Sequence, residues 1–186
     1  APEVSLYISN PSQYGSKIDD QETAAWMVSN GVKVINMSVS GPFDGPGDGS
    51  SPYSESILNT IDLTIASGAI WVNAAGNWAE ANWIGDYSDV DGDNFIEFAL
   101  GQEQNCFDLS IHKELLVRLR WEDTWYQAAR DFDLYLMDKN RTVYLDSSQE
   151  MQSGRPGDDP YEVLVYSAPA NDEYCLLIHQ SSGTAP

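Results

Sequence analysis

The chain has 186 residues, of which 42% are hydrophobic, enough to build one large or two small packed domains. It carries 29 acidic and 9 basic residues and a formal net charge of −20. A field of that sign repels nucleic acids and anionic membranes, so we expect neither as a partner. No apolar run approaches the roughly 20 residues of a membrane-spanning helix.

The first 79 residues alternate between strand-like and helix-like patterns. Strands are expected at 4–8, 32–37 and 69–74, and helices at 20–30 and 54–67. Asp19 or Asp20 is the expected cap of the first helix, and Gly31 and Gly68 are stop signals after the two helices. Because the two later strand runs are apolar on both faces, the alternation predicts a parallel α/β unit.

The second half shows no helix of note. Strand-like runs occur at 95–100, 106–111, 115–121, 132–137, 142–145, 161–166 and 174–179. Turn-forming residues separate most of these runs, which favours an antiparallel, jelly-roll-like β-sandwich. The predicted fold is therefore α/β plus all-β, with an α/β domain at 1–79, an acidic linker at 80–94 and a β-sandwich domain at 95–186.

The two cysteines, Cys106 and Cys175, are 69 positions apart, too far for a Cys-x-x-Cys site. In an extracellular chain they would form one disulfide. The alternative is two buried thiols that pack as small hydrophobic side chains. The sequence leaves both open, since each cysteine lies in a strand-like run.

An acidic loop in the linker carries Asp89, Asp91 and Asp93 at alternating positions. In a tight loop this spacing aims three carboxylates at one point, as oxygen-ligated Ca²⁺ sites require. An EF-hand is not expected, because its glycine position holds Asn94 and its final glutamate position holds Leu100. A looser calcium loop and a solvated acidic linker remain as alternatives.

Three segments of the first half, which begin at Ala1, Val34 and Ala66, agree in order and spacing with those of a known family. They resemble subtilisin-like serine proteases (subtilases). The first strand, Ala1-Pro-Glu-Val-Ser-Leu-Tyr7, resembles the strand after the family's catalytic-histidine helix. The run Val34-Ile-Asn-Met-Ser38 with Gly41 resembles the strand that lines the substrate groove. Ala66-Ser-Gly68 with Asn73-Ala-Ala-Gly-Asn77 resembles the strand that leads to the oxyanion-hole asparagine.

The resemblance implies roles for residues at the ends of these strands. Asn77 would be the oxyanion donor, because a fixed neutral amide can stabilise the charge that develops on a tetrahedral intermediate. Two groups of residues would bind the peptide substrate: Ser38, Val39, Ser40 and Gly41 as an added strand, and Ala74, Ala75 and Gly76 as a pocket wall.

The family's catalytic Asp, His and Ser motifs are not found in the sequence. The histidines, His112 and His179, lack the flanking residues of the family's histidine motif. By the resemblance we expect an internal fragment that begins after the histidine element and ends before the serine element. Such a fragment would be inactive alone, would need the remaining parts of the catalytic domain, and would use no cofactor for the chemistry. Uncovered sheet edges also make a dimer of the fragment possible.

The second half resembles the β-sandwich domains of secreted bacterial proteases, in the runs 132–138 and 173–178. The resemblance implies a secreted, extracellular endopeptidase that acts on peptides or proteins, with a β-sandwich inserted between the oxyanion asparagine and the serine. The alternative is a non-catalytic binding or scaffold protein whose β-sandwich recognises protein or carbohydrate. Trp125 and Tyr126 would serve such a surface or pack within the fold.

Overall fold

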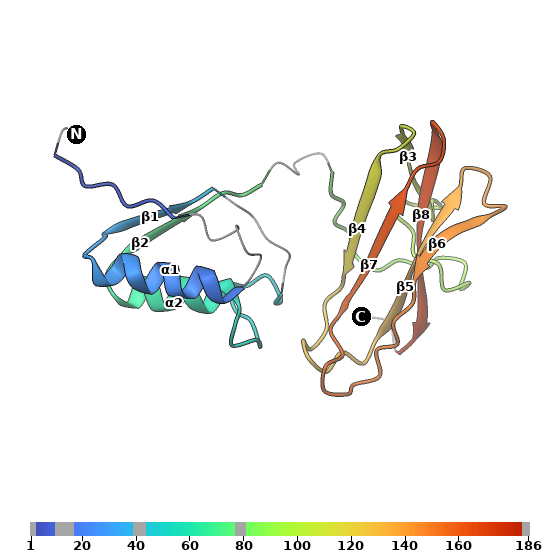
Figure 1. The fold of residues 1–186 in the computed structure, drawn as a ribbon. Helices are drawn as coiled ribbons and strands as arrows, with labels where there is room; N and C mark the ends of the chain where they lie inside the picture. The colour runs from blue at the N-terminus through green and yellow to red at the C-terminus, as the bar shows by residue number, and fades with distance from the viewer. Residues whose placement is uncertain (1–2, 10–16, 39–43, 77–80, 184–186) are drawn as a thin grey trace. The chain divides into compact units, whose positions relative to one another are not determined.

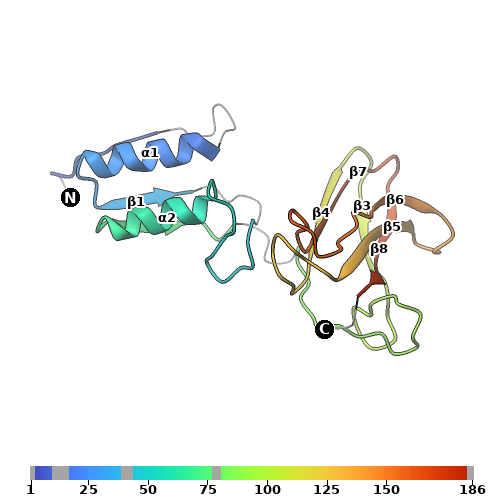
Figure 2. The same cartoon turned by 90° about the horizontal axis from the view of Figure 1, so that it is seen from below.

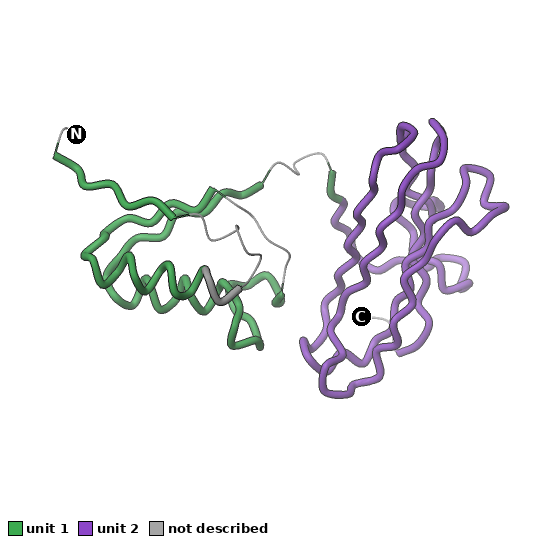
Figure 3. Tube along the Cα trace, viewed as in Figure 1, with its two compact units in different colours: residues 1–82 green, residues 83–186 purple. Residues whose placement is uncertain are grey.

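The computed structural model describes residues 3–9, 17–38, 44–76 and 81–183 (Figure 1). It divides the chain into two compact units, residues 1–82 and 83–186 (Figure 3). Residues 83–94, expected to be linker, belong to the second unit. Within it, the Trp83 ring meets Phe98 edge-on at 4.9 Å and the Tyr87 ring meets Phe132 at 6.3 Å. Within the described ranges, no helix combines the length and the apolar character needed to cross a membrane.

The described residues of the first unit form two helices and a pair of parallel strands. In chain order these are α1 (Lys17–Ser29), β1 (Val34–Met37), α2 (Ile57–Ala66) and β2 (Ile70–Asn73). The strands pair in register from Val34 opposite Ile70 to Met37 opposite Asn73. Figures 1 and 2 together show both helices side by side on one face of the strands. This strand–helix–strand arrangement is the parallel α/β unit that the sequence predicts.

Local chemistry explains the ends of these helices. The Ser56 hydroxyl accepts a hydrogen bond from the Leu58 N–H at 3.1 Å and caps α2. Gly31 and Gly68 follow the two helices with φ of 78° and 86°, a left-handed conformation that glycine adopts without a Cβ clash. The prediction for the start of α1 was wrong. The helix begins at Lys17, so Asp19 and Asp20 lie inside it and do not cap it.

The run 4–8 is not a strand in the structure, contrary to the prediction. Within the described residues the parallel sheet has two strands, and no neighbour forms a ladder with this run. Its apolar side chains are exposed, with Leu6 at 82% and Ile8 at 86%. A strand-like local pattern alone therefore did not produce a strand here, because a strand also requires a partner.

In the second unit, residues 83–183 are described and form six strands in two antiparallel sheets. They are β3 (Asn105–Leu109), β4 (Glu114–Arg120), β5 (Asp131–Asp138), β6 (Tyr144–Ser148), β7 (Tyr161–Ser167) and β8 (Asp172–Ser182). One sheet has the order β3-β8-β5-β6 and the other pairs β4 with β7. Side chains of both sheets share one core, in which Leu134 and Leu136 of β5 pack with Leu164 of β7. The chain thus combines an α/β unit with a β-rich unit.

One predicted strand of this unit is absent. The run 95–100 forms only single bridges, Phe95 with His179 and Ala99 with Gln102. The Ile96 N–H donates to the Ile178 carbonyl at 2.8 Å, so the segment touches β8. It then turns back on itself at Ala99 to Gln102 and cannot continue along the sheet.

Candidate functional site

The candidate site lies where the two parallel strands end. The register places Met37 opposite Asn73, so β1 and β2 stop at the same edge of the sheet. The Ala74 N–H donates to the Met37 carbonyl at 2.9 Å and carries the ladder one residue further. Ser38, the one described residue of the first predicted substrate-binding group, therefore lies near Ala74, the first residue of the second group.

Two hydrogen bonds from asparagine side chains lie at this edge. The Asn36 side-chain amide donates to the Ser38 hydroxyl at 3.0 Å, and the Asn73 amide donates to the Ala74 carbonyl at 2.9 Å. Gly76 has a φ of 88°, which favours glycine and turns the chain after β2. Ala75 and Gly76 are exposed, so an extended ligand could approach their backbone closely.

Four predicted site residues lie outside the described part of the chain. They are Asn77, the predicted oxyanion donor, and the groove residues Val39, Ser40 and Gly41. The described chain stops at Ser38 and Gly76, the residues directly before them.

The acidic loop gathers its three aspartates. Carboxylate oxygens of Asp89, Asp91 and Asp93 lie within 4.8 Å of one another. Two of the aspartates also hold the loop: Asp89 accepts from the Gly92 N–H at 2.8 Å and the Asn94 N–H at 3.1 Å, and Asp93 accepts from the Phe95 N–H at 2.9 Å. Three close oxygen donors of this kind suit a hard cation such as Ca²⁺.

Sequence reasoning missed a fourth acid beside this loop. Glu97 is buried at 7% exposure, and its carboxylate accepts hydrogen bonds from the Ser88 hydroxyl and from the Val90 N–H, the latter at 3.1 Å. It ties the start of the acidic loop to its end. The sequence gives no signal for this role, since an acid beside an acidic loop would be expected in solvent.

The two cysteines form a disulfide in the structure. Cys106 of β3 and Cys175 of β8 are cross-strand partners, and an S–S bond of 2.05 Å joins them. Of the two alternatives left open by the sequence, the structure has the bonded one. The bond links an edge strand to the longest strand of the unit.

A serine, a histidine and an aspartate also meet in the second unit. His179 Nδ1 lies 3.4 Å from the Ser181 hydroxyl and 3.9 Å from Asp133 Oδ2. The Ser181 hydroxyl contacts the Asp133 carboxylate directly. In a catalytic triad the histidine stands between the serine and the acid. The order here is different, so this group does not form a nucleophilic site.

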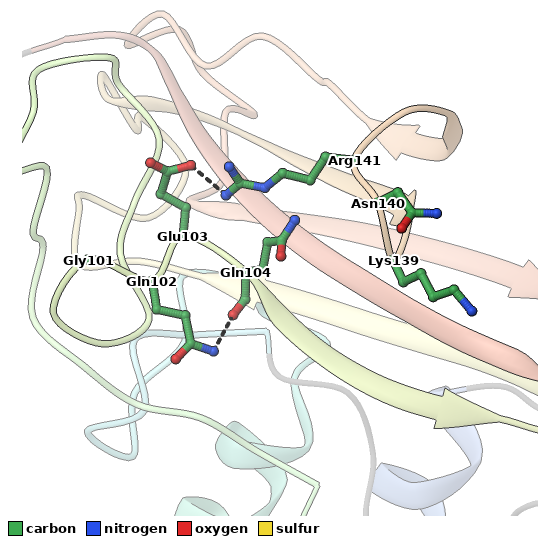
Figure 4. Close-up of a pocket in the computed structure, with 7 residues that line it drawn as sticks. All are labelled: Gly101, Gln102, Glu103, Gln104, Lys139, Asn140 and Arg141. Atoms are coloured by element: carbon green, nitrogen blue, oxygen red, sulfur yellow. Dashed lines mark hydrogen bonds and ion pairs between the residues drawn. The ribbon is translucent and has the colours of Figure 1, made fainter.

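A shallow polar pocket in the second unit is lined by residues 101–104 and 139–141 (Figure 4). Its two cations are already paired: Arg141 with Glu103, and Lys139 with Asp172, the latter pair at 3.1 Å. The pocket therefore offers no unpaired charge that would attract an anionic ligand.

The first unit is a parallel α/β unit, and in open parallel α/β sheets ligands bind at the carboxyl ends of the strands. The sequence model of the Subtilase family matches residues 1–94, half of the chain. The protein therefore belongs to the subtilase family, a family of serine peptidases. The match includes the acidic loop at the start of the second unit. A comparison with curated proteins found no match.

Proposed function

We propose that the chain is the part of a subtilisin-like serine endopeptidase that lines the substrate groove and carries the oxyanion donor. One observation carries the proposal. The in-register pair β1–β2, within the family match, ends with Ser38 beside Ala74. The arrangement supports a groove at this edge, in which we expect Ser38 and the residues after it to pair with an extended peptide as an added strand.

In the proposed mechanism Asn77 acts on the developing charge. A serine attacks the peptide carbonyl, a histidine takes its proton, and the Asn77 amide donates a hydrogen bond to the oxygen of the tetrahedral intermediate. The small residues Ala74, Ala75 and Gly76 let the substrate side chain approach the wall of the pocket. The serine, histidine and aspartate come from the remaining parts of the catalytic domain, and no cofactor takes part.

Exposed apolar side chains of the first unit support the need for those remaining parts. Val34, Ile70 and Val72 of the two strands are 58%, 60% and 47% exposed. Leu63 and Ile65 of α2 are 62% and 53% exposed. Apolar side chains in such number fit a surface that is covered in the complete domain. Without that cover the chain would use the same surface to form a dimer.

We propose that the second unit is a β-sandwich of jelly-roll type, inserted in the catalytic domain of a secreted enzyme. Its place in the chain, a few residues after Asn77, supports an insertion between the oxyanion asparagine and the serine. The bond between Cys106 and Cys175 supports an extracellular location, because disulfides persist in oxidising compartments.

The test is the Asn77→Ala substitution in the full-length enzyme, assayed on a peptide substrate. We expect kcat to fall by about 10²–10³-fold with little change in KM, the size known for the oxyanion asparagine of subtilisin itself. Asn30→Ala is the control, because Asn30 is an exposed asparagine of the same unit whose amide bonds only locally, to the Trp26 carbonyl and Ser29. An unchanged kcat would remove Asn77 from this role. A full-length protein without peptidase activity would favour the non-catalytic binding protein.

A separate proposal concerns the acidic loop, which we expect to bind Ca²⁺ as a structural ion. The three carboxylates that lie within 4.8 Å support it, since such close like charges repel one another unless a cation is present. The role is stabilising and adds nothing to the peptidase chemistry.

A further inference from the structure

The outward face of the sheet β4–β7 carries an apolar and basic strip. Leu116 is paired across the strands with Val165, and Arg118 with Val163. Leu116 is 49% and Val165 54% exposed, and Arg118 is also exposed. The alternate residues of β4, such as Leu115 and Val117, turn inward and pack on the core. The strip is therefore the solvent face of a strand pair whose other face is buried.

Aromatic side chains extend the strip at one end. Arg120 is paired across the strands with Tyr161, which is 40% exposed, and the Trp125 ring stacks on Tyr161 at 6.1 Å with 29° between the planes. The sequence left two roles open for Trp125 and Tyr126, a binding surface or packing within the fold. Trp125 packs on Tyr161 at this end of the strip, whereas Tyr126 is 45% exposed.

The charge of this strip is opposite to that of the chain. Arg118 stands at its centre, and among the described residues no carboxylate lies within ion-pair distance of it. The acids around the strip are at its ends, Glu114 on β4 and Asp159 and Glu150 near Tyr161. In a protein with 29 acidic and 9 basic residues, a central arginine between apolar side chains favours a ligand that brings its own carboxylate.

The backbone of β4 is open along the same residues. The Ala168 N–H donates to the Lys113 carbonyl at 3.0 Å, and the Trp121 N–H donates to the Pro160 carbonyl at 3.2 Å. These bonds show which cross-strand pairs of the ladder are the hydrogen-bonded ones. Bonded pairs recur at every second residue of an antiparallel ladder, so Leu116 and Arg118 direct their N–H and C=O groups away from β7. Within the described part of the chain no backbone group bonds to them there.

We propose that the open edge of β4 is a docking site for an extended peptide segment with alternating apolar and acidic residues. The segment adds to the sheet as a third strand. Its backbone pairs with Leu116 and Arg118. Because successive side chains of a strand face opposite sides, its carboxylates share the outward face with Arg118, and its apolar side chains lie on the inner face beside Leu115 and Val117. This site requires no catalysis, so it stands apart from the proposed peptidase function.

The test measures binding of labelled peptides to the whole 186-residue chain by fluorescence anisotropy. The probes are an end-capped octapeptide that alternates valine and glutamate, and its counterpart with lysine in place of glutamate. Because the chain has a net charge of −20, non-specific attraction favours the lysine peptide. We expect the glutamate peptide to bind at least about 10-fold more tightly, which only local recognition can produce. Preference for the lysine peptide, or no binding of the glutamate peptide up to about 1 mM, would overturn the proposal.

Two changes locate the binding site. Arg118→Glu should reverse the preference between the peptides, whereas Arg155→Glu, the same charge change on an exposed loop of the same unit, should leave it unchanged. A glutamate peptide with N-methyl groups on the amides that would face β4 should lose binding, because it cannot complete the ladder. Equal binding by the Arg118→Glu variant or by the methylated peptide would contradict docking at this edge.

Discussion

The hydroxyl of Ser148, at the end of β6, hydrogen-bonds to the carboxylate of Glu162, which β7 holds inside the second unit. The same carboxylate accepts from the Glu150 N–H at 3.0 Å and from the Gln152 side-chain amide at 3.1 Å. Glu162 is 1% exposed, and among the described residues no lysine, arginine or histidine pairs with it. A buried carboxylate without a cation thus organises the segment that follows β6.

Replacing Glu162 tests how this group stabilises the fold. Glu162→Gln keeps an oxygen for Glu150 and Gln152, and its amide can donate to Ser148, so we expect the free energy of unfolding at pH 7 to change by less than about 1 kcal/mol. Glu162→Leu leaves the two N–H donors buried without an acceptor, at a cost of about 1–3 kcal/mol for each. Urea unfolding of both variants measures the difference. Equal stability of the two variants would show that the hydrogen bonds contribute little.

The stability of wild type and that of Glu162→Gln should depend differently on pH. Burial raises the pKa of Glu162 above its ordinary value of 4.5. At pH values between the ordinary and the raised pKa, the folded state therefore binds more protons than the unfolded state. Its contribution to stability is therefore complete below about pH 4.5 and is lost as the pH rises through the raised pKa. Wild type should lose stability relative to Glu162→Gln between pH 4 and 7. A constant difference across that range would show that Glu162 does not titrate in this way.

Loss of the disulfide should weaken the second unit. The bond between Cys106 and Cys175 closes a loop over a sequence separation of 69. Loop-closure entropy for that length corresponds to about 4 kcal/mol, and native disulfides in small domains contribute about 2–5 kcal/mol. We expect the Cys106→Ala, Cys175→Ala double variant to unfold at correspondingly lower urea concentration. Wild type with reductant serves as the control, and unchanged unfolding in both would contradict the prediction.

Calcium should raise the melting temperature of the chain. Binding to the folded state alone stabilises it by about 2.7 kcal/mol at a Ca²⁺ concentration 100 times Kd. Asp91→Asn should abolish the increase, since it removes one of the three close carboxylates, and it should not lower the melting temperature in EDTA. Asp108→Asn, the same charge change at an exposed residue of β3, is the matched control. Melting that is insensitive to both Ca²⁺ and EDTA would argue against the site.

The turn after β5 depends on one carboxylate. Asp138 accepts from the N–H groups of Val143, Thr142 and Asn140 and from the Thr142 hydroxyl. These hydrogen bonds, with that from the Val143 backbone the strongest, lower the pKa of Asp138 to about 2. Because the folded pKa is depressed, the contribution to stability is complete above about pH 3.8 and is lost as the pH falls through about 2.

Asp138→Asn should therefore lower the melting temperature at pH 7, and the gap from wild type should narrow as the pH falls from 4 to 2. Thr142→Val, which removes only the hydroxyl donor, should have a smaller effect. An NMR titration of the Asp138 carboxyl carbon checks the pKa directly. A midpoint near 3.8 would show that the turn does not hold the ionised form.

Much of the backbone follows from local pattern. Helices α1 and α2 were expected, because each run of helically spaced apolar residues is followed by a glycine. Gly31 and Gly68 adopt the left-handed conformation that ends the helices. The runs 4–8 and 95–100 have strand-like patterns similar to those of the true strands. They differ in having no continuous partner, and pairing is a property of the whole chain that a local pattern does not contain.

Part of the candidate site could also be predicted from local pattern. Ser38 and Ala74 could be expected to meet, because two parallel strands joined by a helix end at one edge of the sheet. Outside the candidate site, the buried position of Glu162 could not be identified from the sequence. It lies in the alternating run of β7, and an acid there would be assigned to the solvent face, whereas three hydrogen-bond donors allow it to lie inside.

The disulfide also decides what a single backbone cut can do to the second unit. Strands β4 to β7 all lie between Cys106 and Cys175 in the chain, so they belong to one covalent ring. A peptidase that cleaves one exposed loop of this ring, such as that around Arg155, opens the ring but releases no fragment. The nicked chain would migrate as a single species until reductant separates its pieces. For a member of a peptidase family, this linkage keeps the β-rich unit attached after one cleavage in its own loops.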